Sequence, residues 1–309
     1  MKTIVKAATV TTIGKVATMV SRAFLGGRRY ITPYNLEKTT NELVIGCYNY
    51  KEPKLSSYKG GIKIFIESLR KFNKTCTIIV LMNTCPPEIK DLFNKNNVNC
   101  LLGFKEKLMY TRFIKYYQII NRYKSFNKIL LCDLDDVIFQ SNPFDIKLDT
   151  NKLYCAQEIL SYNDLSDVGT LLNLKWIRYA HKFNIGLKNI YIKNYKNKNI
   201  ICAGTILGNR NAILSYLIWY EKIQTKAVKL RNDQALLNIY AYEYGDNTII
   251  VERYHDGQIL TLNGMNFENI RKDSNGFLIN SNEEKYCIIH QIDRCGEENL
   301  KYLKDTILV

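Results

Sequence analysis

Short apolar runs of strand length alternate with amphipathic helical patterns through the first half of the chain, and this alternation limits the folds that the chain can adopt. The predicted strands are residues 43–47, 77–81, 98–102 and 128–132. The predicted helices between them are residues 63–72, 88–94 and 109–123, where apolar side chains recur at helical spacing. Strands joined by helices in this way form βαβ crossovers, so we predict an α/β fold with a mainly parallel sheet flanked by helices.

The second half of the chain has a more mixed pattern. We predict a strand or turn rich in small residues at 199–208, helices at 212–227 and 233–242, and strands at 247–252 and 286–290. Residues 163–198 carry no pattern that we can interpret. A chain of 309 residues is long enough for one large core, and we predict a single domain over residues 36–309.

Basic residues outnumber acidic ones by 44 to 29, which gives a formal net charge of +15. Such a charge favours anionic partners. The basic residues are spread along the chain without the spacing of a nucleic-acid-binding motif, so we expect no nucleic-acid partner. Residues 1–35 contain no acidic residue. We predict that they form a flexible basic extension; the alternatives are weak association with a membrane surface and an organellar targeting signal.

Nine cysteines are dispersed along the chain without a C-x-x-C pair, and several lie in apolar runs, as Cys132 and Cys287 do. An odd number of scattered cysteines does not suit a disulfide framework. We therefore expect free, buried thiols in a reducing compartment, and we predict a cytoplasmic location.

Three carboxylates, Asp133, Asp135 and Asp136, directly follow the last predicted strand of the first half. In an open parallel sheet, ligands bind beyond the carboxyl ends of the strands. Burial of unpaired carboxylates that repel one another is unfavourable, and a shared cation removes that cost. Hard oxygen ligands of this kind suit Mg²⁺ or Mn²⁺, and Asp133 and Asp135, two residues apart, can face the same side. The alternative is a solvated polar turn.

The run from Cys132 to Phe144, CDLDDVIFQSNPF, resembles the D-x-D region of GT-A nucleotide-diphospho-sugar transferases. In one branch of that family the pattern reads D-x-x-D-V-x-F-Q-x-D-P-F, and this chain departs from it at Asn142. Three further pieces resemble the family in the same order along the chain. They are CAGTILG at 202–208, NDQALLN at 232–238 and HQIDR at 290–294. The resemblance covers residues 40 to 295.

The resemblance implies a metal-dependent glycosyltransferase with a GT-A fold, whose mixed second half faces the acceptor. The implied metal ligands are Asp133, Asp135, Asp136 and His290, and an imidazole ligand shifts the preference from Mg²⁺ toward Mn²⁺. The implied donor is a nucleoside-diphosphate sugar, with uracil as the expected base. The acceptor would be a hydroxyl of a glycan, a lipid or a protein.

Further residues, inside and outside the matching pieces, receive roles from the same resemblance. Asp233 and Gln234 are the candidate catalytic residues, which would bind donor-sugar hydroxyls or assist attack by the acceptor. An inverting reaction requires a carboxylate base, for which Asp233 is the first candidate, whereas a retaining reaction does not; the sequence leaves both open. The candidate nucleotide- and donor-binding residues are Cys47, Tyr48, Asn49, Arg112, Asp133, Gly204, Thr205 and Arg294.

Two other functions fit parts of the sequence. In a haloacid-dehalogenase-type phosphohydrolase, Asp133 would be the nucleophile and Asp135 the general acid/base. Asp136 stands where that class has a small residue, and 132 residues precede the motif. A non-catalytic protein that binds anionic polymers would use the positive charge and the 22 tyrosines, but it leaves the acidic cluster unexplained.

Overall fold

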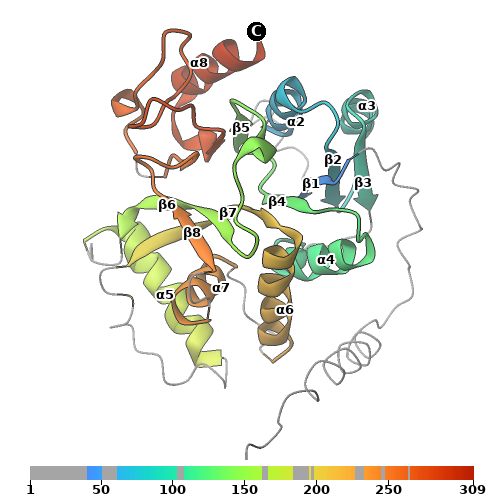
Figure 1. Cartoon of the computed structure of the whole chain (residues 1–309), viewed down its shortest axis with the longest axis vertical. Helices are drawn as coiled ribbons and strands as arrows, with labels where there is room; N and C mark the ends of the chain where they lie inside the picture. Colours follow the sequence, from blue (N-terminus) through green and yellow to red (C-terminus); the bar gives the residue numbers. More distant parts are fainter. Residues whose placement is uncertain are drawn as a thin grey trace, which may run out of the picture. The chain divides into compact units, whose positions relative to one another are not determined.

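A seven-stranded sheet forms the centre of the computed structural model (Figure 1). The structure describes residues 40–50, 61–102, 108–161, 166–183, 195, 198–226, 233–244, 248–263 and 265–309. The predicted N-terminal extension, residues 1–35, lies outside this range, as does most of the segment 184–197. Residues 38–309 form one compact unit.

Six of the seven strands run in the same direction. The order across the sheet is β3-β2-β1-β4-β7-β6-β8, and β7 is antiparallel to both of its neighbours. In chain order, the strands are β1 (Glu42–Tyr48), β2 (Thr77–Met82), β3 (Val98–Leu102), β4 (Lys128–Cys132), β6 (Leu153–Ser161), β7 (Asn199–Asn209) and β8 (Ile249–Glu252). Every residue of β2 is buried, as expected for a strand covered on both faces.

Helices pack on both sides of this sheet (Figure 1). On one side lie α2 (Gly61–Phe72) and α3 (Pro87–Lys95). The helices on the other side are α4 (Leu108–Arg122), α5 (Val168–Phe183), α6 (Arg210–Lys226) and α7 (Asp233–Ile239), the last continuing into a π-helical turn at Tyr240–Tyr244. The structure therefore confirms the predicted α/β fold with a mainly parallel sheet.

A second sheet of three strands lies beside α2 and carries residues from late in the chain. Its order is β5 (Val137–Phe139), β10 (Ile288–His290) and β9 (Ile259–Thr261), with β10 antiparallel to β5 and parallel to β9. Helix α8 (Glu297–Leu308) contacts α2. A separate apolar cluster fills this part of the molecule, and it includes Ile138, Ile289 and Leu303.

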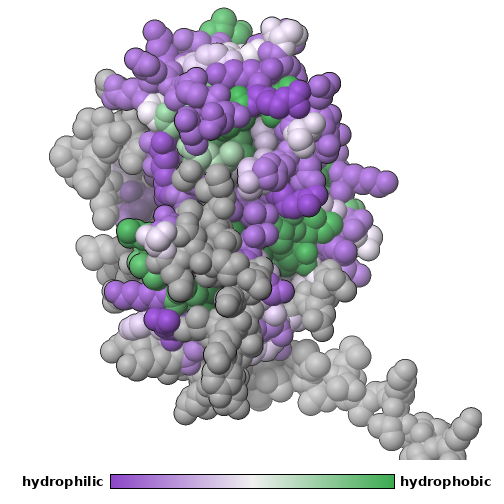
Figure 2. All heavy atoms as spheres, turned by 90° about the vertical axis from the view of Figure 1, so that its left-hand side faces the viewer, coloured by the Kyte–Doolittle hydropathy of each residue, from purple (hydrophilic) through white to green (hydrophobic). Residues whose placement is uncertain are grey.

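Hydrophilic residues cover most of the described surface on the face drawn in Figure 2, and apolar residues appear between them in small groups. The large apolar residues that are exposed on α5 are Val168, Leu171, Leu172 and Tyr179. Within the described ranges, no helix is both long enough and apolar enough to cross a bilayer. All nine cysteines are described, and all are free thiols.

Candidate metal centre and sugar-donor site

The pairing of β4 with β7 places the first aspartate of the cluster. Cys132 pairs with Thr205, and the next backbone amide, that of Asp133, donates to the carbonyl oxygen of Gly204 at 2.8 Å. Residues 134–136 then form a bend before β5. Leu134 turns into the core, where its side chain is buried. The turn therefore begins at the carboxyl end of β4, where a ligand site was expected.

The small sheet brings the histidine to the same place. His290 pairs with Val137 on one side and with Thr261 on the other. The amide of Ile292 donates to the carbonyl oxygen of Asp136 at 3.1 Å, which ties the turn to the chain that follows His290. Strand register, rather than a long side chain, thus fixes the histidine beside the acidic turn.

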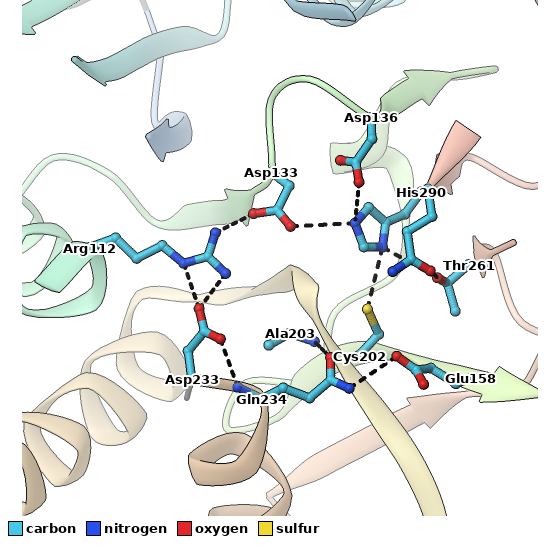
Figure 3. A network of polar contacts seen from close by, with 11 residues as sticks. Arg112, Asp133, Asp136, Glu158, Cys202, Ala203, Asp233, Gln234, Thr261 and His290 are labelled. Carbon is cyan, nitrogen blue, oxygen red and sulfur yellow. Dashed lines mark hydrogen bonds and ion pairs between the residues drawn. The ribbon is translucent and has the colours of Figure 1, made fainter. Parts of the chain in front are cut away.

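Asp133, Asp136 and His290 form a compact cluster (Figure 3). The Nε2 atom of His290 lies 3.5 Å from Asp133 Oδ2 and 3.4 Å from Asp136 Oδ2, and one potential ligand atom from each residue lies within 4.8 Å of the others. Two carboxylates and an imidazole are a suitable ligand set for Mn²⁺. The buried Oδ1 atom of Asp136 has no hydrogen-bond partner among the described residues. The cluster therefore fits a divalent cation.

The other ring nitrogen of His290 faces a hydroxyl whose own proton is already used. Thr261 donates to Gln291 Oε1 at 2.7 Å, and its Oγ1 lies 3.4 Å from His290 Nδ1. A hydroxyl that donates elsewhere accepts here, so Nδ1 carries the hydrogen and Nε2 is the nitrogen left for a cation. The Cys202 thiol also lies 3.4 Å from Nδ1. Thr261 belongs to none of the matching motifs, so it was not among the predicted site residues.

Gly204 allows this close packing. A β-carbon built at this position would lie 2.1 Å from Cε1 and 2.3 Å from Nε2 of His290, and 2.9 Å from Asp133 Oδ2. Side chains do not approach one another so closely. Only glycine fits at this position, because it has no side chain. The backbone of β7 can therefore lie directly beside the cluster.

Arg112 joins the cluster to Asp233, one of the two catalytic candidates. It lies on α4 with 5% of its surface exposed, and it forms ion pairs with Asp133 and with Asp233 (Figure 3). Its Nε donates to Asp233 Oδ2 at 2.8 Å. The guanidinium of Arg112 therefore points toward the two aspartates rather than into solvent.

These contacts set the charges of the cluster. Burial raises the pKa of Asp133, but Arg112 and His290 outweigh it and lower that pKa to about 2. Burial lowers the pKa of His290, but Asp136 and the other neighbouring groups raise it well above its usual value. In the absence of a cation, His290 is therefore positively charged and neutralises part of the carboxylate charge.

Asp135 lies apart from the three clustered residues. It is exposed, and its carbonyl oxygen lies close to Gly61 at the start of α2. Desolvation by the surrounding protein is the main reason that its pKa is raised to about 7, and the charges of Asp136 and Asp133 add to the effect. Its charge in turn contributes to a raised pKa of Tyr48, for which burial is the larger cause. Asp135 therefore lies toward the end of β1. Asp136, rather than Asp135, is the second aspartate of the cluster.

A second polar network surrounds Gln234, the other catalytic candidate. Its Nε2 donates to Glu158 Oε1 at 3.1 Å and to Asn173 Oδ1 at 2.8 Å, and its Oε1 accepts from the amide of Ala203 at 3.4 Å. Glu158 is buried on β6, with 2% of its surface exposed. Sequence reasoning missed Glu158 and Asn173 because neither lies in one of the matching motifs.

The remaining predicted donor-binding residues occupy three settings. Cys47 is buried near the end of β1, whereas Tyr48 and Asn49 are half-buried where that strand ends. Thr205 is fully buried. Arg294 is exposed, and its Nη1 donates to Asn263 Oδ1 at 2.5 Å.

Several residues of the matching motifs hold the fold together instead of facing the site. Gln140 is buried and exchanges hydrogen bonds with the backbone of Leu278 and Tyr286. Asn142 accepts from the amide of Phe144, and its Nδ2 donates to Asp145 at 2.8 Å. An aspartate could not make that donation, so the departure from the family pattern at Asn142 has a structural role.

A mostly parallel sheet with one reversed strand, and an acidic turn at the carboxyl end of its fourth strand, give the chain a GT-A-like fold. The solved apo structure of WbbM, a bifunctional glycosyltransferase, is similar to it, with a TM-score of 0.52 and 12% sequence identity. The match covers 91% of this chain and 52% of that one, so this chain spans about half the length of WbbM. At this identity the likeness shows the fold alone. No protein-family model and no curated protein sequence matches the chain.

Proposed function

We propose that this chain is a metal-dependent glycosyltransferase that moves a sugar from a nucleoside-diphosphate donor, with uracil as the expected base, to an acceptor hydroxyl. The main support is the cluster of Asp133, Asp136 and His290 at the carboxyl end of β4. The GT-A-like fold, shared with a glycosyltransferase, agrees with this assignment.

The chemistry requires positive charge where the diphosphate leaves. A divalent cation held by the cluster, Mn²⁺ by preference, would act as a Lewis acid for the departing diphosphate. Arg112 adds a fixed guanidinium beside Asp133. The buried position of Arg112 strengthens its electrostatic effect, because little water is present to screen it.

The stereochemical outcome depends on Asp233. Its Oδ2 accepts from Arg112, and its Oδ1 accepts from the backbone amide of Gln234 at 2.9 Å. An inverting reaction would require Arg112 to release this carboxylate so that it could take the acceptor's proton. A retaining reaction makes no such demand.

The test is incubation of the full chain with Mn²⁺ and a panel of nucleotide sugars, with release of nucleoside diphosphate as the measured product. We expect slow release that chelation abolishes and that is lost in Asp136→Ala. Asp149→Ala, which removes an exposed aspartate outside the cluster, is the matched control. Release of phosphate from phosphomonoesters would instead support the hydrolase, and salt-sensitive polymer binding without either activity would support the binding protein.

We also propose a cytoplasmic location, with residues 1–35 as a flexible basic extension; weak attachment to membrane surfaces through these residues is the alternative. Cosedimentation of the full chain with anionic vesicles, compared with neutral ones and with a chain lacking residues 1–35, measures that attachment. Equal sedimentation with both kinds of vesicle would contradict it.

A further inference from the structure

The orientation of the Gln234 side chain is determined by its neighbours. Asn173 Nδ2 donates to the carbonyl oxygen of Gly169 at 2.9 Å, so its Oδ1 is the atom that faces Gln234. On the other side, Arg294 can only donate, which turns Asn263 Oδ1 toward it and Asn263 Nδ2 toward Glu158, at 3.1 Å from Oε2. Asn173 therefore requires Gln234 to present its amide nitrogen, and the same nitrogen donates to the Glu158 oxygen that Asn263 does not contact.

This arrangement uses all the donors of Gln234. A side-chain amide carries two N–H groups, and those of Gln234 are directed to Glu158 and Asn173. Its carbonyl oxygen accepts one bond, from the amide of Ala203. A carbonyl oxygen has two lone pairs, so one acceptor position is all that Gln234 has left for a ligand.

We propose that Glu158 is a positioning residue, which with Asn173 fixes Gln234 so that it presents only its carbonyl oxygen to a hydroxyl of the donor sugar. This inference rests on the proposed function. It is supported by the position of Gln234 directly after Asp233, whose carboxylate shares Arg112 with Asp133 (Figure 3). It is also supported by the burial of Glu158, which needs its two amide partners to offset the cost of desolvation.

Two substitutions separate the orienting role of Glu158 from its charge. In Glu158→Gln one carboxylate oxygen becomes an NH₂ group, which then faces the NH₂ group of either Gln234 or Asn263. In Asn263→Asp two carboxylates face each other. The double variant Glu158→Gln/Asn263→Asp restores a donor opposite an acceptor at both contacts and moves the charge to position 263, where Arg294 still donates.

The first measurement is the crystal structure of each variant. In Glu158→Gln we expect the side-chain carbonyl oxygen of Gln234 to lose its hydrogen bond from the backbone amide of Ala203. In the double variant we expect this hydrogen bond to form again. An unmoved Gln234 in both Glu158→Gln and Asn263→Asp would overturn the inference. Asn263→Asp serves as the test if Glu158→Gln does not fold, because Asn263 is only half-buried. In that variant the repulsion between the two carboxylates should displace Glu158 and, with it, Gln234.

The second measurement is Mn²⁺-dependent release of nucleoside diphosphate. For Glu158→Gln we expect a fall in kcat of about 10- to 100-fold, the cost of a misplaced group, with Mn²⁺ affinity unchanged and most of the rate recovered in the double variant. A double variant as slow as Glu158→Gln would show that the charge matters instead, and would overturn the inference.

Glu252→Gln is the matched control. Glu252 is a buried carboxylate on the neighbouring β8 that accepts from the backbone amide of Gln258 at 2.5 Å, a bond that a glutamine oxygen can also accept. We expect this variant to lose stability without losing rate. If the wild-type chain releases no nucleoside diphosphate from any nucleotide sugar, the proposed function fails, whereas the crystal structures still decide whether Glu158 orients Gln234.

Discussion

Gly204 matters at the scale of a single residue because His290 occupies the space that a side chain would need. We predict that Gly204→Ala displaces the imidazole, lowers stability by about 1–3 kcal/mol as overpacked sites do, and sharply weakens Mn²⁺ binding. Denaturant unfolding and paramagnetic resonance of free Mn²⁺ measure the two effects. Gly208→Ala is the control on the same strand, since its β-carbon would meet its nearest atom at 3.1 Å. Equal Mn²⁺ affinity in both variants would contradict the role of Gly204.

The proton on His290 has two consequences for pH dependence. A cation needs the neutral imidazole, so we predict that Mn²⁺ binding releases a proton and that the Mn²⁺ affinity increases with pH, by up to about tenfold per unit for one proton. Because the folded pKa of His290 is raised, its contribution to the stability of the cation-free protein is complete below pH 6.5 and is lost as pH rises through the folded pKa.

Unfolding in the presence of a chelator, measured from pH 6 upward, checks the second consequence. The loss of stability should disappear in His290→Gln and persist in His255→Gln, which alters an exposed histidine. A pH-independent Mn²⁺ affinity would show that His290 is not charged in the cation-free protein.

Residues with a role but no motif could not be found from the sequence. The run of three aspartates is visible because carboxylates rarely crowd after a buried strand. Glu158 and Thr261 each stand alone in a strand, and only strand register places them beside Gln234 and His290. The choice between Asp135 and Asp136 depends on the geometry of the turn, which spacing alone did not determine.

At the scale of elements, α7 holds the two catalytic candidates through one buried asparagine. Asn238 accepts from the amide of Ile201 at 3.0 Å and donates to its carbonyl oxygen at 2.8 Å. We predict that Asn238→Ala lowers stability by about 2–4 kcal/mol, because two buried backbone groups lose their partner, and that it lowers the rate because α7 shifts against β7.

Denaturant unfolding together with nucleoside-diphosphate release measures both effects. Arg70→Met is the control, since Arg70 also bonds to several backbone carbonyls, among them that of Cys76, but lies at the end of α2. A similar fall in rate for both variants would mean that stability alone, and not the placement of α7, controls the rate.

The elements missed by sequence reasoning share physical causes. Strands β5 and β9 have three residues each, too few to show a period. Helix α5 carries apolar residues on its buried face, such as Leu174 and Ile177, and also on its exposed face, such as Val168 and Leu171. Apolar residues on both faces hide the helical period. Strand β6 was also missed, although it has nine residues. Strands β1 to β4 and β7, by contrast, were predicted nearly to their ends.

At the scale of the whole molecule, ligand binding should be visible as stabilisation. We predict that Mn²⁺ and uridine diphosphate together, at about 100 times their Kd, raise the Tm by roughly 5–10 °C, because they bind only the folded state. Asp136→Ala should abolish the shift, and Asp135→Ala should reduce it less, since Asp135 lies outside the cluster. A larger loss in Asp135→Ala would reverse the assignment of the ligands.

His290 belongs to the last tenth of the chain, whereas the two aspartates of the cluster lie near its middle. During synthesis the acidic turn is therefore made long before His290. A product truncated before β10 would keep the carboxylates and their repulsion but lack the imidazole. If the cluster binds a cation as proposed, full binding therefore requires that β10 has been made and has paired with β5.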